Sequence, residues 1–149
     1  SRCLNMSELL LSGVYAGSMA GVIMTLIAHI APRFAVKNFI KEPENLQLFG
    51  RPITRREADL MGVFIHLLVS LFAGLGFAYG VERGWMAGFH IVPMIAWSML
   101  MLFCSGAVIM PIEGHGFFGR KHDSWFVIDA ILTNLLWGIL YLTFIRLWL

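Results

Sequence analysis

The chain has 149 residues, of which 58% are hydrophobic and only 13% are charged, and its formal net charge is +2 at pH 7. A soluble globular domain is closer to half apolar and a quarter charged, so this composition indicates a membrane protein. So small a net charge excludes a nucleic-acid-binding footprint. The two cysteines, Cys3 and Cys104, form no CxxC pair that would indicate zinc or redox chemistry.

Four stretches of the chain are long and apolar enough to cross a bilayer, which takes about 20 residues of α-helix. They are residues 9–31, 60–81, 85–112 and 125–145. The sequence therefore predicts a single transmembrane domain, residues 1–149, of the all-α class. We expect a polytopic integral membrane protein with four transmembrane helices in an antiparallel bundle.

Local signals refine these helices. The sequence Thr54-Arg-Arg-Glu57 reads as a capping box, which predicts that the second helix begins near Arg55. Only residues 82–84 separate the second and third spans, so these two helices are expected to form an antiparallel hairpin. Pro93 lies inside the third predicted span and is expected to kink it.

Basic residues predict the orientation of the helices. The connections at 32–58 and 113–124 lie on one side of the membrane and hold eight Lys and Arg residues, whereas the other side holds three. The positive-inside rule then places both long connections in the cytoplasm and both termini outside it. We expect this arrangement in a bacterial cytoplasmic (inner) membrane.

The first predicted helix carries Gly13, Gly17 and Gly21, each four residues apart. This spacing puts the glycines on one stripe, along which another helix can approach closely. The stripe predicts helix packing. The sequence leaves open whether the helix that packs on it belongs to this chain or to a partner subunit.

Two histidines in the spans, His29 and His66, are candidate ligands for a haem or chlorophyll, because imidazole binds both iron and magnesium. The alternative is that they form hydrogen bonds between helices. Their unequal depth in the predicted spans, by roughly 6 Å at the helical rise, is awkward for a pair of axial ligands. No cofactor is firmly implied, although membrane lipids are expected to bind.

Asp129 is the one acidic residue within a predicted span, and an intramembrane carboxylate is a functional hypothesis by default. Thr133, Trp137 and Tyr141 follow it at steps of four, with Asn134 beside them. This stripe is expected to face the bundle interior. Pairing of Asp129 with a histidine or Arg120 competes with a role in proton transfer.

The sequence from Met110 to Gly119, MPIEGHGFFG, is the most distinctive in the chain. Its glycines and proline predict a structured turn that ends the third helix. Glu113 and His115 within it would be too few ligands for a metal site.

These features together resemble a family of small, uncharacterised four-helix bacterial membrane proteins, a domain of unknown function. The resemblance rests on the glycine stripe of the first helix, on Gly74, Gly76, Ala78 and Gly80 in the second, and on the Met110–Gly119 sequence. It implies a topology and no chemistry.

Three functional hypotheses follow. The first is an accessory or structural transmembrane subunit of a larger bacterial membrane complex, of a bioenergetic kind, with other transmembrane subunits as partners. The second is a haem- or pigment-binding electron-transfer protein with His29 and His66 as ligands. The third is a small transporter or membrane enzyme that uses Asp129. The sequence contains no catalytic triad or phosphate loop, which favours the first hypothesis.

Overall fold

The structure is a computed structural model, and it describes residues 5–30, 47–48, 50–112, 116–120 and 124–149. The elements in chain order are α1 (Met6–Ile30), β1 (Gln47–Leu48), β2 (Arg51–Pro52), α2 (Arg55–Glu82), α3 (Ile91–Cys104), a π-helical turn (Ser105–Ile109), α4 (Met110–Ile112), a 3-10 turn (Phe117–Gly119) and α5 (Ser124–Trp148). The two short strands pair antiparallel, with Gln47 opposite Pro52 and Leu48 opposite Arg51.

Four helical segments are long and apolar enough to cross a membrane, as the sequence predicts. They are Met6–Ala28, Asp59–Glu82, Ile91–Ile112 and Val127–Trp148, with mean hydropathies between 1.7 and 2.2. The predicted all-helical fold with four such helices is therefore confirmed. The third segment runs without interruption through α3, the π-helical turn and α4.

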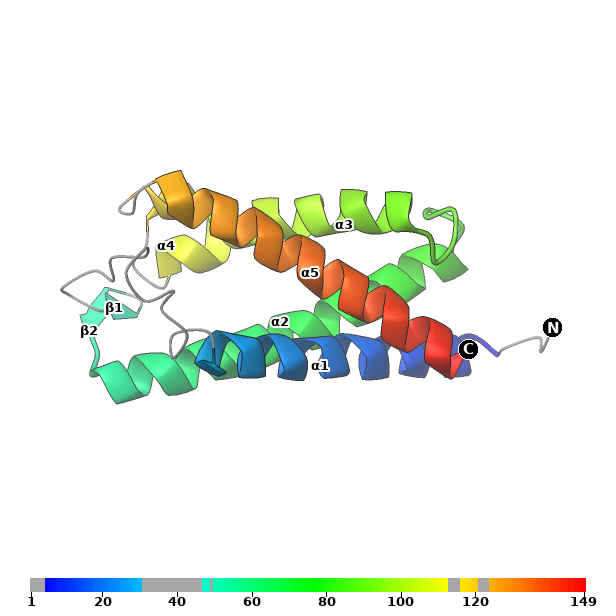
Figure 1. Ribbon diagram of the computed structural model, residues 1–149, viewed down its shortest axis with the longest axis horizontal. Helices are drawn as coiled ribbons and strands as arrows, with labels where there is room; N and C mark the ends of the chain where they lie inside the picture. Colours follow the sequence, from blue (N-terminus) through cyan, green and yellow to red (C-terminus); the bar gives the residue numbers. More distant parts are fainter. Residues whose placement is uncertain (1–4, 31–46, 49, 113–115, 121–123) are drawn as a thin grey trace.

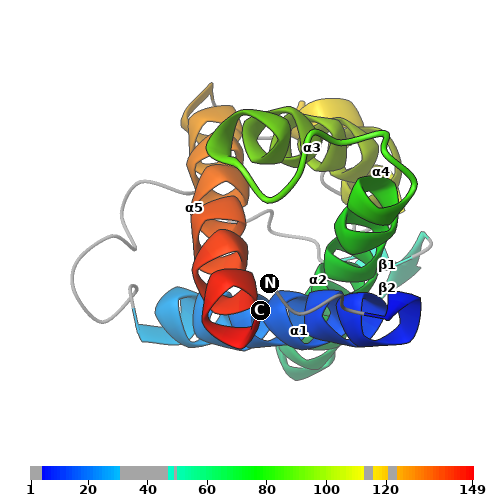
Figure 2. The same cartoon turned by 90° about the vertical axis from the view of Figure 1, so that its right-hand side faces the viewer.

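The helices form a four-sided bundle. Viewed from one end, α1, α2, α3 and α5 each occupy one side (Figure 2). The start of α1 and the end of α5 lie at one end of the bundle, and β1 and β2 lie at the other (Figure 1). The main packing pairs are α1 with α2, α1 with α5 and α3 with α5. Helices α2 and α3 are consecutive and run in opposite directions, as predicted, and they meet near their connection, where Phe77 contacts Trp97 with ring centroids 5.9 Å apart. Away from that end the two helices diverge (Figure 1).

The start of the third helix is a second correction. The predicted span begins at Trp85, but α3 begins at Ile91 and residues 83–90 form turns. Gly84 and Gly88 have φ of +75° and +107°, a region that glycine enters without steric cost and that ends a helix. Pro93 consequently lies in the first turn of α3, where a missing N–H does no harm, and not in mid-span as a kink.

The third span changes its helical winding near its other end. In the turn Ser105–Ile109 the helix widens, and the Met110 N–H donates to the Ser105 carbonyl five residues earlier. Pro111 follows at once and has no N–H to donate. Such π-helical turns are rare and occur frequently at functional sites.

The predicted capping box at the start of α2 is confirmed. The Thr54 hydroxyl accepts a hydrogen bond from the Glu57 N–H at 3.3 Å, and the Glu57 carboxylate accepts one from the Thr54 N–H at 2.8 Å. These bonds satisfy two of the free backbone donors at the helix start.

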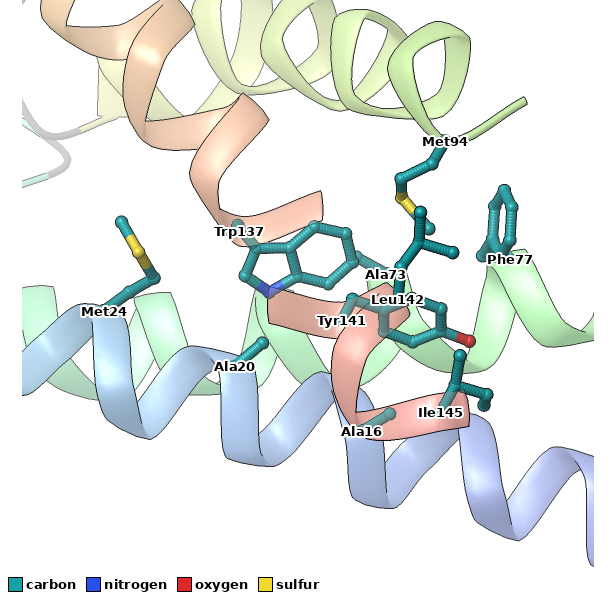
Figure 3. Close-up of a cluster of buried hydrophobic side chains, with 10 residues drawn as sticks. All are labelled: Ala16, Ala20, Met24, Ala73, Phe77, Met94, Trp137, Tyr141, Leu142 and Ile145. Carbon is teal, nitrogen blue, oxygen red and sulfur yellow. The ribbon is translucent and has the colours of Figure 1, made fainter. Parts of the chain in front are cut away.

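The core is aromatic and lies where α1, α2, α3 and α5 meet (Figure 3). The Tyr141 ring stacks on Trp137 with centroids 5.4 Å apart, and its edge meets Phe77 at 5.7 Å. The buried Tyr141 hydroxyl donates a hydrogen bond of 3.0 Å to the Gly74 carbonyl. This bond ties α5 to α2 across the centre of the bundle.

Candidate functional site

The glycine stripe of α1 meets α2 of the same chain. A methyl group added at Gly17 would lie 2.5 Å from the Ser70 carbonyl oxygen and 2.9 Å from the Gly74 Cα. At Gly13 it would overlap the Ala78 Cβ, and at Gly21 it would lie 2.7 Å from the Ser70 Cβ. The two helices therefore approach at backbone distance along an antiparallel seam.

The seam shows that the three glycines of α1 pack on a helix of the same chain, a point that the sequence left open. Their neighbours are small residues on α2, so the predicted packing takes place inside the chain. Of the small residues on which the resemblance rests, Gly74 and Ala78 form the other half of this contact, whereas Gly76 faces Trp97 and Gly80 faces Met86. Any surface for a partner helix therefore lies elsewhere on the bundle.

The candidate ligand histidines lie on different helices, α1 and α2. The side chain of His29 is outside the described residues. His66 is half-buried on α2, and its Nε2 atom is buried with no hydrogen-bond partner among the described residues. No group of three or more possible metal ligands occurs in the described parts of the chain. Glu113 and His115 lie outside them.

Asp129 and Asn134 do not come together as one polar site. The Asn134 amide donates to the Ala130 carbonyl of its own helix at 2.8 Å. Asp129 is exposed near the start of α5, and no ion pair of its carboxylate occurs within the described residues. Of the predicted inward stripe, Trp137 and Tyr141 are buried, so the half of it nearer the C-terminus faces the interior.

The described part of the Met110–Gly119 sequence forms a structured corner, as predicted. Phe118 has φ of +51°, which costs a non-glycine residue roughly 1–2 kcal/mol. Its ring covers Gly106 in the π-helical turn, where an added methyl group would lie 2.5 Å from the ring, and it packs on Phe103 at 5.4 Å. Gly106 thus makes room for the Phe118 ring.

A groove between α3 and α5 was not predicted from the sequence. It has a volume of about 160 Å³ and is lined by Ile91, Met94, Ile95, Ser98, Leu135 and Ile139. At its floor the helices approach closely, since a methyl group on Gly138 would lie 2.6 Å from the Ser98 hydroxyl. The one available signal was the pair of small residues, Ser98 and Gly138, each in the middle of an apolar helix.

No protein-family model, curated protein or solved structure matches the chain. The class of protein therefore rests on the fold itself, which is a bundle of four helices that are long and apolar enough to cross a membrane. The resemblance to the uncharacterised four-helix family stays a prediction.

Proposed function

We propose that the chain is a multi-pass membrane protein that serves as an accessory transmembrane subunit of a larger bacterial membrane complex. The supporting observation is the incomplete coverage of the third span. Within its most apolar window only 11% of residues are buried in the chain, against 39% for the first span. Helix α3 packs chiefly on α5, which leaves its outer face free for a neighbouring helix.

That outer face carries a stripe on which a partner helix can pack. Ala96, Leu100 and Cys104 are all exposed and are spaced four residues apart along α3. Two of the three side chains are small, and small residues let transmembrane helices approach closely. The stripe replaces the glycines of α1 as the proposed partner surface.

A bulky residue in this stripe tests the proposal. The tagged protein and its variants are extracted from the native membrane with mild detergent and analysed on native gels. We expect the wild type to migrate in a larger complex and Ala96→Trp to migrate alone. Val22→Trp introduces the same side chain at an exposed position on α1 and is expected to stay in the complex. Wild-type protein that migrates only as a free monomer would contradict the proposal.

The Nε2 atom of His66, buried and without a hydrogen-bond partner among the described residues, favours a second candidate function, that of a haem- or pigment-binding protein. A neutral imidazole with a free ring nitrogen is the form that binds a metal. The absorption spectrum of the purified protein tests this function. A Soret or chlorophyll band that disappears in His66→Ala would support it, and the absence of any such band from folded wild type would exclude it.

A further inference from the structure

The groove between α3 and α5 opens on the outer surface of the bundle. Ile91, Ile95 and Ile139 form its rim and are 49%, 44% and 52% exposed, whereas Met94 and Ser98 at its floor are 1% exposed. Dry apolar cavities of about 150 Å³ hold a group the size of benzene, so the groove can take a segment of a hydrocarbon chain.

A cationic side chain, that of Arg146, lies beyond one end of the groove. Leu135, Ile139 and Arg146 lie at steps of four and seven along α5, which places them on one face of that helix. Arg146 lies eleven residues from Leu135, or about 16 Å at the helical rise. Its Nη2 atom donates to the Phe89 carbonyl at 3.0 Å, just before Ile91 at the groove rim.

The guanidinium of Arg146 has further donors to offer. Arginine carries five N–H groups, and one of them accounts for the bond to Phe89. The side chain is exposed, and no carboxylate of the described residues forms an ion pair with it. Because guanidinium groups bind phosphate through paired hydrogen bonds, the position suits a phosphate group at the level of lipid headgroups.

We propose that this groove is a binding site for an anionic phospholipid. One acyl chain lies between α3 and α5 against the isoleucine rim, and the phosphate binds Arg146. The apolar walls exclude a polar ligand, and Arg146 beyond one end of the groove sets the direction of the acyl chain. This site is separate from the α3 stripe at Ala96, Leu100 and Cys104, so the lipid and a partner subunit can bind together.

Native mass spectrometry of the purified protein tests the site with two lipids, phosphatidylglycerol and phosphatidylcholine. We expect the first phosphatidylglycerol to bind about tenfold more tightly than the first phosphatidylcholine. Ile139→Trp fills the groove and should weaken both lipids at least fivefold. Leu26→Trp is the control, because Leu26 is 54% exposed on α1 and α1 does not line the groove.

The role of the positive charge of Arg146 is tested separately. Arg146→Gln should weaken phosphatidylglycerol more than phosphatidylcholine and so remove the preference, because both lipids carry a phosphate but only phosphatidylglycerol carries a net negative charge. Arg83→Gln removes an exposed cation at the C-cap of α2 and should behave as the wild type. Circular dichroism confirms folding, and Ile95→Phe serves as a second groove-filling variant if Ile139→Trp fails to fold.

Three outcomes would overturn the assignment. The first is equal lipid binding by the groove-filling variants and Leu26→Trp. The second is an equal loss of preference in Arg146→Gln and Arg83→Gln. The third is tighter binding of palmitate than of phosphatidylglycerol, which would identify a fatty acid as the ligand.

Discussion

Substitution by alanine is expected to have opposite effects on stability at two glycines of this chain, Gly17 and Gly62. Gly17 on α1 faces the backbone of α2, and an added methyl group would lie 2.5 Å from the Ser70 carbonyl oxygen. Gly62 on α2 has no atom within 4 Å of that position. A backbone carbonyl cannot turn away as a side chain can, so only the first substitution forces two helices apart.

Gly17→Ala is therefore expected to destabilise the fold by about 1–3 kcal/mol, the usual cost of overpacking a tight contact. Gly62→Ala is expected to be neutral or stabilising by up to about 1 kcal/mol, because alanine favours helix over glycine. Reversible unfolding in mixed micelles measures both. Equal stability of the two variants would contradict the close approach of α1 to α2.

A second prediction at the scale of the residue concerns Glu57, which lies before the membrane-spanning part of α2. Hydrogen bonds from the Thr54 N–H and then from the Thr54 hydroxyl hold the pKa of this carboxyl below its usual value. A lowered pKa means that the capping box stabilises the helix start above the ordinary glutamate pKa. That contribution is lost as the pH falls through the lowered pKa.

Thr54→Val removes the hydroxyl and keeps the backbone N–H. We expect the Glu57 pKa to rise in this variant and to stay below the ordinary value, because the larger of the two causes remains. Carboxyl carbon shifts in an NMR titration report this pKa directly. Thr143→Val, at a distant exposed threonine, should leave it unchanged; an unmoved Glu57 pKa in Thr54→Val would show that the hydroxyl bond does not form.

At the scale of the element, the corner at the end of the third span depends on a fit between two segments. The ring of Phe118 covers Gly106 in the π-helical turn, and this contact holds Phe118 at a positive φ. Strained residues persist only where the surroundings determine them. The corner is therefore the most sensitive to a change at Gly106.

Gly106→Ala places a methyl group 2.5 Å from the Phe118 ring and should displace it. The N–H groups of Gly119 and Arg120, which donate to Gly116 and Phe117 at 3.1 and 3.2 Å, would then lose protection. Hydrogen exchange should be at least tenfold faster at these two amides. Gly62→Ala is the control, and unchanged exchange in Gly106→Ala would mean that the Phe118 ring does not hold the turn.

The elements themselves were largely predictable, because apolar length and the Thr54–Glu57 capping box are local signals. The late start of α3 was not, since residues 85–90 are as apolar as a span. Only the positive φ of Gly84 and Gly88 shows that they form turns. The widened turn at Ser105–Ile109 has no such sequence signal beyond Pro111.

The candidate site was less predictable than the fold. The glycine stripe predicted a close contact, but α2 as its partner depends on which helices become neighbours. The groove depends on Ser98 and Gly138, which lie 40 residues apart in sequence and meet only when α5 packs on α3. Contacts of this kind are set by tertiary structure and leave no periodic pattern in the sequence.

At the scale of the whole molecule, the predicted orientation is open to a direct test. Both described ends of the chain lie at one end of the bundle, so a single fusion reports on both (Figure 1). The excess of Lys and Arg in the two long connections predicts termini outside the cytoplasm. A C-terminal alkaline phosphatase fusion should be active, and a C-terminal green fluorescent protein fusion should not fluoresce. The opposite result would place the termini in the cytoplasm and contradict the predicted orientation.

Helix α3 packs chiefly on one other helix, α5, and this has a consequence for the order in which the helices are synthesised. Helices α1 and α2 seal against each other through the glycine seam as soon as both have left the ribosome. Helix α3 emerges next, and it packs chiefly on α5, which is made last. Until α5 is made, α3 lacks its main packing partner. The growing chain therefore passes through a stage in which α1 and α2 can pack but α3 still waits for α5.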